Sequence, residues 1–264
     1  MKPSLRTAAA AVFASIAITT ALDASGLSAF SALPLFPLML LLWYLEQHAR
    51  KDIGFTWGQP RDYCWALLYP VLVLGAVGII AAATGAVDIS RTDWGKAARN
   101  VALVSASTVL VALITEEGFF RGWLFASLQR AGVGRNAILL WSSLAFSLWH
   151  WSAVTLTTGF DLPGAQIPVY MVNAAVMGLI WALLRSMSGS IVVSSVSHGL
   201  WNGAAYVLFG FGTKAGALGI VQTALFGPEV GFLGLALNLL FAAALWRVVV
   251  RSPLPPAQRR RAQA

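Results

Sequence analysis

The segment STVLVALITEEGFFRGWLFASL (residues 107–128) places two adjacent glutamates, Glu116 and Glu117, inside a long apolar run, with Arg121 four positions later. Apolar segments of about 17–25 residues are long enough to cross the hydrocarbon core of a bilayer as helices. A charged side chain at that depth costs about 2.5–3.5 kcal/mol on insertion scales, so such residues are rarely kept without a use. The segment therefore predicts a membrane helix that carries a functional site.

The composition of the whole chain fits this class of protein. Of 264 residues, 58% are hydrophobic and 11% are charged, whereas about a quarter of the residues in an ordinary soluble domain are charged. The single cysteine, Cys64, excludes an internal disulfide framework and a cysteine-rich metal site. We predict an all-α polytopic membrane protein, a bundle of about eight transmembrane helices with its active site in an intramembrane cavity.

Eight apolar segments are long enough to span a bilayer. They cover approximately residues 7–24, 30–47, 64–84, 98–117, 136–153, 166–186, 189–210 and 229–250. The first segment, which follows the basic start MKPSLR, also has features of a signal peptide; we retain it as a span because the charge distribution then fits best. Because no internal repeat or linker interrupts the chain, residues 1–264 are interpreted as one membrane domain, with 251–264 as a disordered basic tail.

The lysine and arginine residues predict the orientation. If both termini are cytoplasmic, 14 of the 18 basic residues lie on the cytoplasmic side, Arg121 and Arg185 among them. The four on the outer side are Arg91, Lys96, Arg99 and Lys214. Since cytoplasmic loops carry an excess of Lys and Arg, we expect a multi-pass protein of the plasma (inner) membrane with both termini inside. The basic residues lie between apolar segments and form no basic domain, so the expected partner is the lipid bilayer and no nucleic acid.

Few ionisable residues remain within the predicted spans. Only Glu116 and Glu117 lie where one apolar helix continues into another, and His150 and His198 lie in the fifth and seventh spans, whereas His48 lies in a loop. The other eight acidic residues fall at span ends or in loops: Asp23, Glu46, Asp52, Asp62, Asp88, Asp93, Asp161 and Glu229.

Helical spacing separates the roles of the two glutamates. Glu117 and Arg121 are four residues apart with the acid first, which is the favourable order for an ion pair on one helix face. Glu116 is rotated by about 100° from Glu117 on a helix of 3.6 residues per turn, so it points elsewhere. We predict that Arg121 holds Glu117 in a supporting role, while Glu116 is free to face the bundle interior.

The segments FSLWH and HGLWN use the same spacing to place Phe146 with His150 and His198 with Asn202. Helical bundles build sites from inward-facing side chains on facing helices. A buried carboxylate suits a general base, a neutral histidine shares that work or binds a metal, and an asparagine amide donates to an oxyanion. The set Glu116, His150, His198 and Asn202 therefore indicates attack of an activated water on an amide bond.

Two versions of this chemistry remain open. In one, Glu116, His150 and His198 hold Zn²⁺ and leave one open position, as a catalytic zinc requires. In the other, Glu116 activates the water and no cofactor is needed. The signatures of other proteases are missing, because the sequence has no H-E-x-x-H zinc helix, no G-x-S-x-G elbow and no intramembrane aspartate pair.

Three segments carry a family resemblance: EEGFFR (116–121), FSLWH (146–150) and HGLWN (198–202). In order and spacing they resemble the E-E-x-x-x-R, F-x-x-x-H and H-x-x-x-N motifs of the CPBP family, also called Abi, which contains CAAX prenyl proteases and bacteriocin-processing enzymes. The resemblance covers residues 97–210, the expected motif-bearing core. It implies an intramembrane endopeptidase, commonly labelled a metalloprotease, that hydrolyses a peptide bond in a membrane-associated or lipophilic peptide or protein.

The resemblance also implies roles for single residues. Glu116 with His150 would activate water, and His198 with Asn202 would stabilise the oxyanion, while Glu117 supports the site together with Arg121. Aromatic residues flank the motifs, and they line either a substrate groove or ordinary helix contacts: Phe119, Phe120, Trp123, Trp149, Trp151 and Trp201.

Two other classes of function also fit the polar residues. An ion- or proton-coupled transporter would use Glu116, His150 and His198 as a relay across the membrane. A non-catalytic membrane scaffold or immunity factor would need none of them for chemistry.

Overall fold

The computed structural model describes residues 4–157 and 159–251. Its elements, in chain order, are α1 (Leu5–Ala24), η1 (Ser28–Phe30), α2 (Leu35–Glu46), α3 (Arg50–Ile53), α4 (Pro60–Ala83), α5 (Trp94–Ile114), η2 (Glu117–Trp123), α6 (Leu124–Arg130), α7 (Arg135–Trp149), α8 (Trp151–Leu156), η3 (Gly164–Gln166), α9 (Ile167–Ser188), α10 (Ile191–Ala204), η4 (Ala205–Phe209), β1 (Gly210–Phe211), β2 (Lys214–Ala215), α11 (Thr223–Phe226) and α12 (Phe232–Arg251). The fold is all-helical apart from one short antiparallel hairpin of β1 and β2. Beyond Arg251, the predicted tail lies outside the described residues.

Seven helical segments among the described residues are long and apolar enough to cross a membrane, which confirms the prediction of a polytopic all-α membrane protein. They are Leu5–Ala24, Ser28–Glu46, Pro60–Ala83, Trp94–Ile114, Arg135–Leu156, Gly164–Ser188 and Phe232–Val249. The remaining predicted span, 189–210, is helical but divided. Its α-helical part, α10, has 14 residues and continues as the π-helical turn η4.

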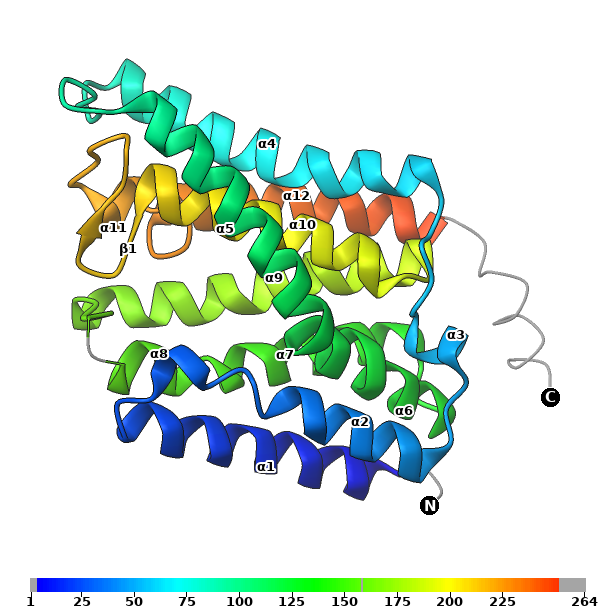
Figure 1. Ribbon diagram of the computed structural model, residues 1–264. Coiled ribbons are helices and arrows are strands. Elements are labelled where there is room, and N and C mark those ends of the chain that lie inside the picture. The colour runs from blue at the N-terminus through cyan, green and yellow to red at the C-terminus, as the bar shows by residue number, and fades with distance from the viewer. Residues whose placement is uncertain (1–3, 158, 252–264) are drawn as a thin grey trace.

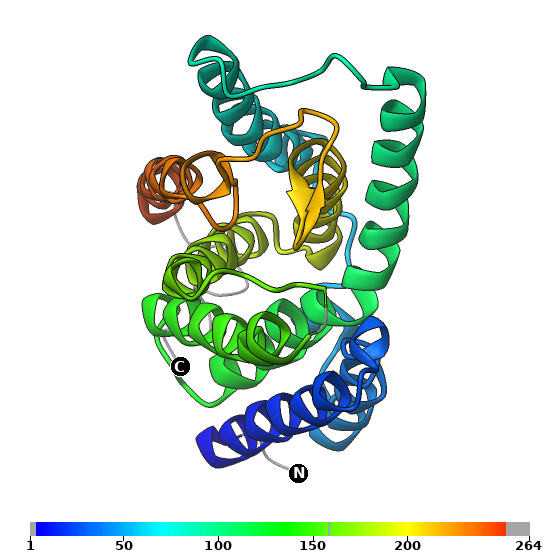
Figure 2. The same ribbon diagram turned by 90° about the vertical axis from the view of Figure 1, so that its left-hand side faces the viewer.

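The helices form a bundle with two distinct ends (Figure 1). The start of α1 and the end of α12 lie at one end, together with α3 and the end of α6; we call it the basic end. The opposite end carries β1, β2 and α11, and we call it the hairpin end. Figure 2 shows the bundle from the hairpin end, with the strands toward the viewer and α5 standing apart from α4.

Helix α10 is placed against α5 by two glycines of the HGLWNG segment. A Cβ atom at Gly199 would lie 2.6 Å from the backbone nitrogen of Val109, and one at Gly203 would lie 2.9 Å from the carbonyl oxygen of Val101. Small residues four apart let membrane helices approach closely. At its start, α10 is capped by Ser190, whose side chain accepts from the backbone N–H groups of residues 192 and 193.

A buried chain of polar side chains joins α4, α9 and α12. The hydroxyl of Tyr69 donates to Asn238 Oδ1 at 2.8 Å, and the Asn238 amide donates to Asn173 Oδ1 at 2.8 Å. The Asn173 amide then donates to the carbonyl oxygens of Pro228 and Glu229, both at 2.9 Å. These bonds satisfy buried polar groups, and they fix the turn that precedes α12.

Four of the acidic residues expected at span ends or in loops do lie there, and they are buried. Their exposed fractions are 2% for Asp23 and Glu46, 6% for Asp62 and 8% for Glu229. They lie near element ends, as predicted, but packed neighbours cover them and supply donors. For example, Glu46 accepts hydrogen bonds from His48, Trp123 and Ser127.

Two arginines that were counted on the cytoplasmic side are also buried. Arg121 has no exposed surface and lies in the bundle interior, and Arg185 is 5% exposed on the last turns of α9. The guanidinium of Arg185 donates to the carbonyl oxygens of Arg121 and Asp52. The Gly178 carbonyl that Arg121 reaches and both carbonyls that Arg185 reaches lie more than fifty residues away in sequence, so spacing along one helix does not predict these contacts.

Replacing Gly203 with alanine tests the contact of α5 with α10. The added Cβ would lie 2.7 Å from the backbone nitrogen of Ser105, so the two helices must separate. We expect the free energy of unfolding to fall by about 1–3 kcal/mol, measured as a lower Tm in detergent. Gly75→Ala on α4 is the matched control, because a Cβ there meets nothing within 4 Å. An equal Tm for both variants would contradict the close packing.

Candidate active site

The glutamate pair lies where the helical geometry changes. Helix α5 ends at Ile114, and Thr115 has φ −107° and ψ −94°, outside the helical region. The chain then continues as the π-helical segment η2, although the sequence predicted ordinary α-helical spacing there. π-Helical turns are rare and frequent at functional sites. The result is that Glu116 and Glu117 lie in the middle of the bundle, and the chain runs on toward the basic end as α6.

The predicted ion pair of Glu117 with Arg121 is present. Glu117 Oε1 lies 3.3 Å from Arg121 Nη1, and neither side chain has exposed surface. Arg121 Nη2 also donates to the carbonyl oxygen of Gly178 at 3.1 Å. A Cβ at Gly178 would lie 3.2 Å from Arg121 Nη2, so a glycine there leaves room for the guanidinium. The guanidinium lies 4.1 Å from the ring centroid of Phe146, which adds a cation–π contact.

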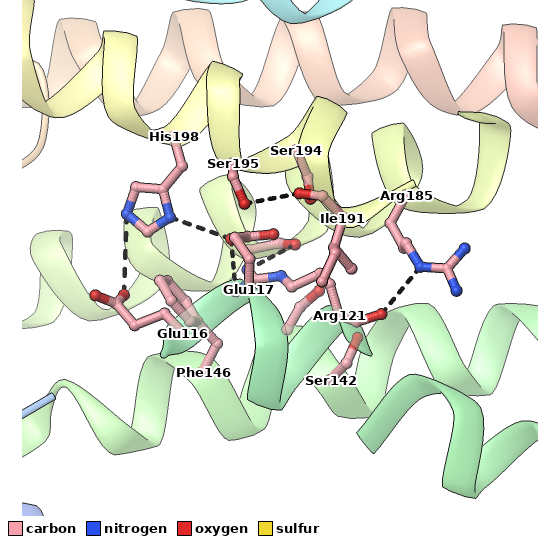
Figure 3. Close-up of polar contacts among 12 residues, drawn as sticks. Glu116, Glu117, Arg121, Ser142, Phe146, Arg185, Ile191, Ser194, Ser195 and His198 are labelled. Carbon is pink, nitrogen blue, oxygen red and sulfur yellow. Dashed lines mark hydrogen bonds and ion pairs between the residues drawn. The ribbon is translucent and has the colours of Figure 1, made fainter. Parts of the chain in front are cut away.

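Glu117 has a second role that the sequence did not reveal, because it also holds His198. Its Oε1 lies 3.1 Å from His198 Nδ1 (Figure 3). Since the carboxylate paired with Arg121 accepts hydrogen bonds, Nδ1 of His198 carries the donated proton and Nε2 of the neutral ring presents a lone pair. The ring stacks on Trp181 with centroids 3.9 Å apart and planes 11° apart, which fixes its orientation.

His150 is oriented by its own helix. It ends α7, and its Nδ1 lies 2.9 Å from the carbonyl oxygen of Phe146. A carbonyl only accepts, so Nδ1 is the protonated nitrogen and Nε2 is left with its lone pair. The rings of Phe146 and His150 have centroids 4.4 Å apart, which confirms the predicted i, i+4 pairing.

Glu116 faces both histidines. Its Oε2 lies 3.8 Å from His150 Nε2 and 3.9 Å from His198 Nε2. This oxygen is buried and has no hydrogen-bond partner among the described residues. Three acceptors, Glu116 Oε2 and the Nε2 atoms of His150 and His198, therefore face the same place. The distances from the carboxylate oxygen to the two nitrogens are longer than a direct hydrogen bond. Such a place suits a group that supplies protons, and a water molecule is the simplest one.

Asn202 lies on α10 one turn beyond His198, toward the hairpin end. Its side chain is half-buried, and its amide makes no hydrogen bond within residues 4–157 and 159–251. Among the predicted site residues, the structure thus joins Glu116, Glu117, Arg121, His150 and His198 by direct contacts, whereas it shows no such contact for Asn202.

The donor atoms of this site are of types that bind a metal ion, but they are too far apart to hold one as they stand. Two imidazole nitrogens and a carboxylate are suitable zinc ligands, and tetrahedral zinc at about 2.0–2.1 Å places its ligands roughly 3.4 Å apart. The measured separations from Glu116 Oε2 are wider, at 3.8 and 3.9 Å. Across the described part of the chain, no three His, Cys, Asp or Glu side chains are grouped so as to hold a metal ion. The spacing of these acceptors therefore suits a water molecule.

A cavity of about 250 Å³ opens at the hairpin end. It is lined by the loop before α9, by η4 and the hairpin, and by the turn before α12, with Ala205, Phe209 and Glu229 among its residues. An apolar groove of about 520 Å³ between α4, α5 and α10 shares Phe209 with the cavity. Both hollows therefore border η4, and neither has Glu116, His150 or His198 among its lining residues.

Glu229 is a site residue that the sequence analysis missed. Its Oε1 accepts from Trp201 Nε1 at 2.8 Å, and it lines the cavity. Burial raises the pKa of Glu229 to about 7, against the opposing effect of the Trp201 N–H. The sequence feature that could have indicated this residue is the position of Glu229 in GPEVG, between a proline and the apolar start of the last span. Only the folded chain brings it beside the HGLWN segment.

Most of the flanking aromatics are core residues. Phe119, Phe120, Trp123 and Trp201 have no exposed surface and Trp149 is 5% exposed, whereas Trp151 is 53% exposed. The packing interpretation is therefore correct for the first five, and the groove described above is lined by other residues.

Comparison with known proteins identifies one family. Residues 98–204 match the model of the Rce1-like family, described as type II CAAX prenyl endopeptidase Rce1-like. The matched range contains all three motif segments, 116–121, 146–150 and 198–202. A search of curated proteins and a search of solved structures each found no match.

A double-mutant cycle tests the buried ion pair. Arg121→Leu leaves the Glu117 carboxylate buried without its cation, and we expect the free energy of unfolding to fall by about 3–5 kcal/mol. Arg121→Leu combined with Glu117→Leu removes both charges and should be less destabilised than the sum of the single variants. The measurement is denaturant unfolding in detergent, with the exposed Arg247→Leu as control. Additive effects of the two changes would contradict the pairing.

Proposed function

We propose that this chain is an intramembrane protease, on the ground that residues 98–204 match the model of the Rce1-like family, type II CAAX prenyl endopeptidase Rce1-like. It hydrolyses a peptide bond in a membrane-associated or lipophilic peptide by attack of a water that Glu116 and His150 activate. The observation that carries the proposal is the unpartnered Glu116 Oε2, which faces the Nε2 atoms of both His150 and His198.

The first step uses Glu116 as the general base. A water between Glu116 and His150 donates one hydrogen to the Glu116 carboxylate and the other to His150 Nε2, and its oxygen lone pair attacks the carbonyl carbon of the peptide bond. As the carbon–oxygen bond forms, Glu116 takes the proton and the carbonyl oxygen becomes an oxyanion. Glu116 then gives the proton to the leaving nitrogen as the carbon–nitrogen bond breaks, which yields a carboxylic acid and an amine.

Stabilisation of the oxyanion is assigned to His198 and Asn202. Glu117 lies behind Nδ1 of His198, so it favours a positively charged ring, as an aspartate does behind a catalytic histidine. Before the substrate binds, the ring takes a second proton from bulk water at Nε2, and this N–H then donates to the oxyanion without leaving the ring. The Asn202 amide has no bond within the described residues, so it is free to donate as well. Glu117 and Arg121 are positioning residues in this scheme.

The surroundings of the site support a hydrophobic substrate. Phe209 lines both the apolar groove and the cavity, which supports binding of an apolar segment next to the cleaved peptide. The proposed setting is the plasma (inner) membrane with both termini cytoplasmic, and the proposed partners are a hydrophobic peptide or membrane protein and the surrounding lipid.

Glu116→Gln tests the assignment of the base. Glutamine keeps the size of the side chain but cannot take the proton, so kcat should fall by at least about 100-fold. The measurement is cleavage of a fluorogenic, lipid-anchored CAAX peptide by protein purified in detergent. Asp88→Asn at an exposed loop is the matched control and should retain full activity. If the Glu116→Gln variant cleaves at the normal rate with an unchanged Tm, the proposed reaction is wrong.

Metal removal separates the two versions of the mechanism. With water activated by Glu116, purified protein that has been treated with a chelator should keep its cleavage rate, because no step needs a Lewis acid. Elemental analysis of the same sample gives the metal content. Loss of cleavage that added zinc restores would instead support coordination by Glu116, His150 and His198.

A further inference from the structure

The cavity at the hairpin end holds a buried carboxylate without a counter-charge. Glu229 lines this cavity and is 8% exposed. Its Oε1 accepts from Trp201 Nε1 at 2.8 Å, but no lysine, arginine or histidine among residues 4–157 and 159–251 forms an ion pair with it. Burial raises the pKa of Glu229 to about 7, because the charged form has lost water without gaining a cation. A positively charged ligand would supply the missing partner.

A second acceptor in the same cavity also lacks a donor. Gln166 is 8% exposed, and its amide nitrogen donates to Thr223 Oγ1 at 3.3 Å. Its Oε1 is buried and has no hydrogen-bond partner in the described part of the chain. Gln166 and Thr223 both line the cavity. Because a buried acceptor without a donor is destabilising, a ligand that carries several N–H groups would satisfy Gln166 as well as Glu229.

Aromatic rings form much of the apolar wall of this cavity. Phe160, Phe209 and Phe211 line it, and the ring centroids of Phe160 and Phe211 lie 4.6 Å apart. Phe160 and Phe209 are buried, so their rings are held in place by the surrounding chain. The faces of aromatic rings attract organic cations, and sites for alkylammonium groups combine such rings with an acidic side chain.

The charges on the lining select the sign of the ligand. Three charged residues line the cavity, two of them acidic and one basic: Asp161, Glu229 and Lys214. Asp161 and Lys214 are exposed, so water and salt screen their charges, whereas Glu229 is buried. An anion would lie beside the buried carboxylate, and the lining therefore favours a cation.

We propose that this cavity is a second ligand site, which binds a small organic ammonium cation that has an apolar body. The ammonium group donates to the Glu229 carboxylate and to Gln166 Oε1, and the apolar body packs on Phe160 and Phe209. The volume of about 250 Å³ admits one small group, since sites for drug-sized ligands occupy about 300–1,000 Å³. A free amine and the amine headgroup of a phospholipid share this chemistry. The residues of the candidate active site do not line the cavity, so the proposal does not depend on proteolysis.

Titration of benzylamine into the purified full-length protein tests the site. Calorimetry in nonionic detergent at pH 8, above the pKa of Glu229, keeps most of the carboxylate charged. We expect saturable binding to the unchanged protein and at least about tenfold weaker binding to the Glu229→Gln variant, because hydrogen bonds to charged groups are the stronger ones. Glutamine can still accept from Trp201 Nε1, so this variant keeps the contact with α10. Asp88→Asn, an exposed change outside the cavity, is the matched control and should bind normally.

Benzyl alcohol is the matched neutral ligand, because it has the same ring without the charge. We expect it to bind at least about tenfold more weakly than benzylamine, and we expect Gln166→Leu to weaken benzylamine binding with an unchanged Tm. Absence of benzylamine binding, equal affinity of the two ligands, or equal affinity of the unchanged protein and the Glu229→Gln variant overturns the proposal.

Nanodiscs distinguish the two sources of the ammonium group. Benzylamine is titrated into protein in phosphatidylglycerol nanodiscs, and into protein in nanodiscs that also contain phosphatidylethanolamine. Weaker binding in the second set supports a lipid headgroup as the natural occupant, because the headgroup then competes for the cavity. Equal binding in both sets supports a free amine.

Discussion

The buried ion pair between Glu117 and Arg121 is the constraint on which the site depends. Two charges without exposed surface are tolerated only when they satisfy each other and find further hydrogen bonds. Here the guanidinium also reaches the carbonyl of Gly178, and the carboxylate reaches His198. The pair therefore ties η2 to α9 and α10. It also sets the tautomer of His198, so that one electrostatic requirement fixes both the packing and the direction of a lone pair.

Around this pair, further contacts fix the positions of the neighbouring helices. The glycines of α10 bring it against α5, and the chain of Tyr69, Asn238 and Asn173 fixes the turn that carries Glu229. Arg185 donates to the carbonyl oxygen of Arg121. These contacts hold the acceptors around Glu116 in place, which suits hydrolysis, because a reacting group must be kept in a productive geometry.

Glu116 illustrates why an unsatisfied group in a bundle interior is informative. A buried carboxylate oxygen without a donor is destabilising, and the two neighbouring Nε2 atoms, as acceptors, do not relieve this. The arrangement is satisfied only when something that carries protons or positive charge binds. The family match of residues 98–204 and the geometry thus both indicate the same residues, the first through the motif segments and the second through the unpartnered oxygen.

The sequence by itself determined the fold class, the positions of the long helices within a few residues, the Glu117–Arg121 pair and the free Glu116, because these follow from local hydrophobicity and from spacing along one helix. Only the tertiary structure decided the π-helical turn at η2, the second bond of Glu117 to His198, the burial of Arg121 and Arg185, and the place of Glu229 beside Trp201. Each of these depends on partners far away in sequence, and hydropathy and helical periodicity carry no information about which faces of different helices meet.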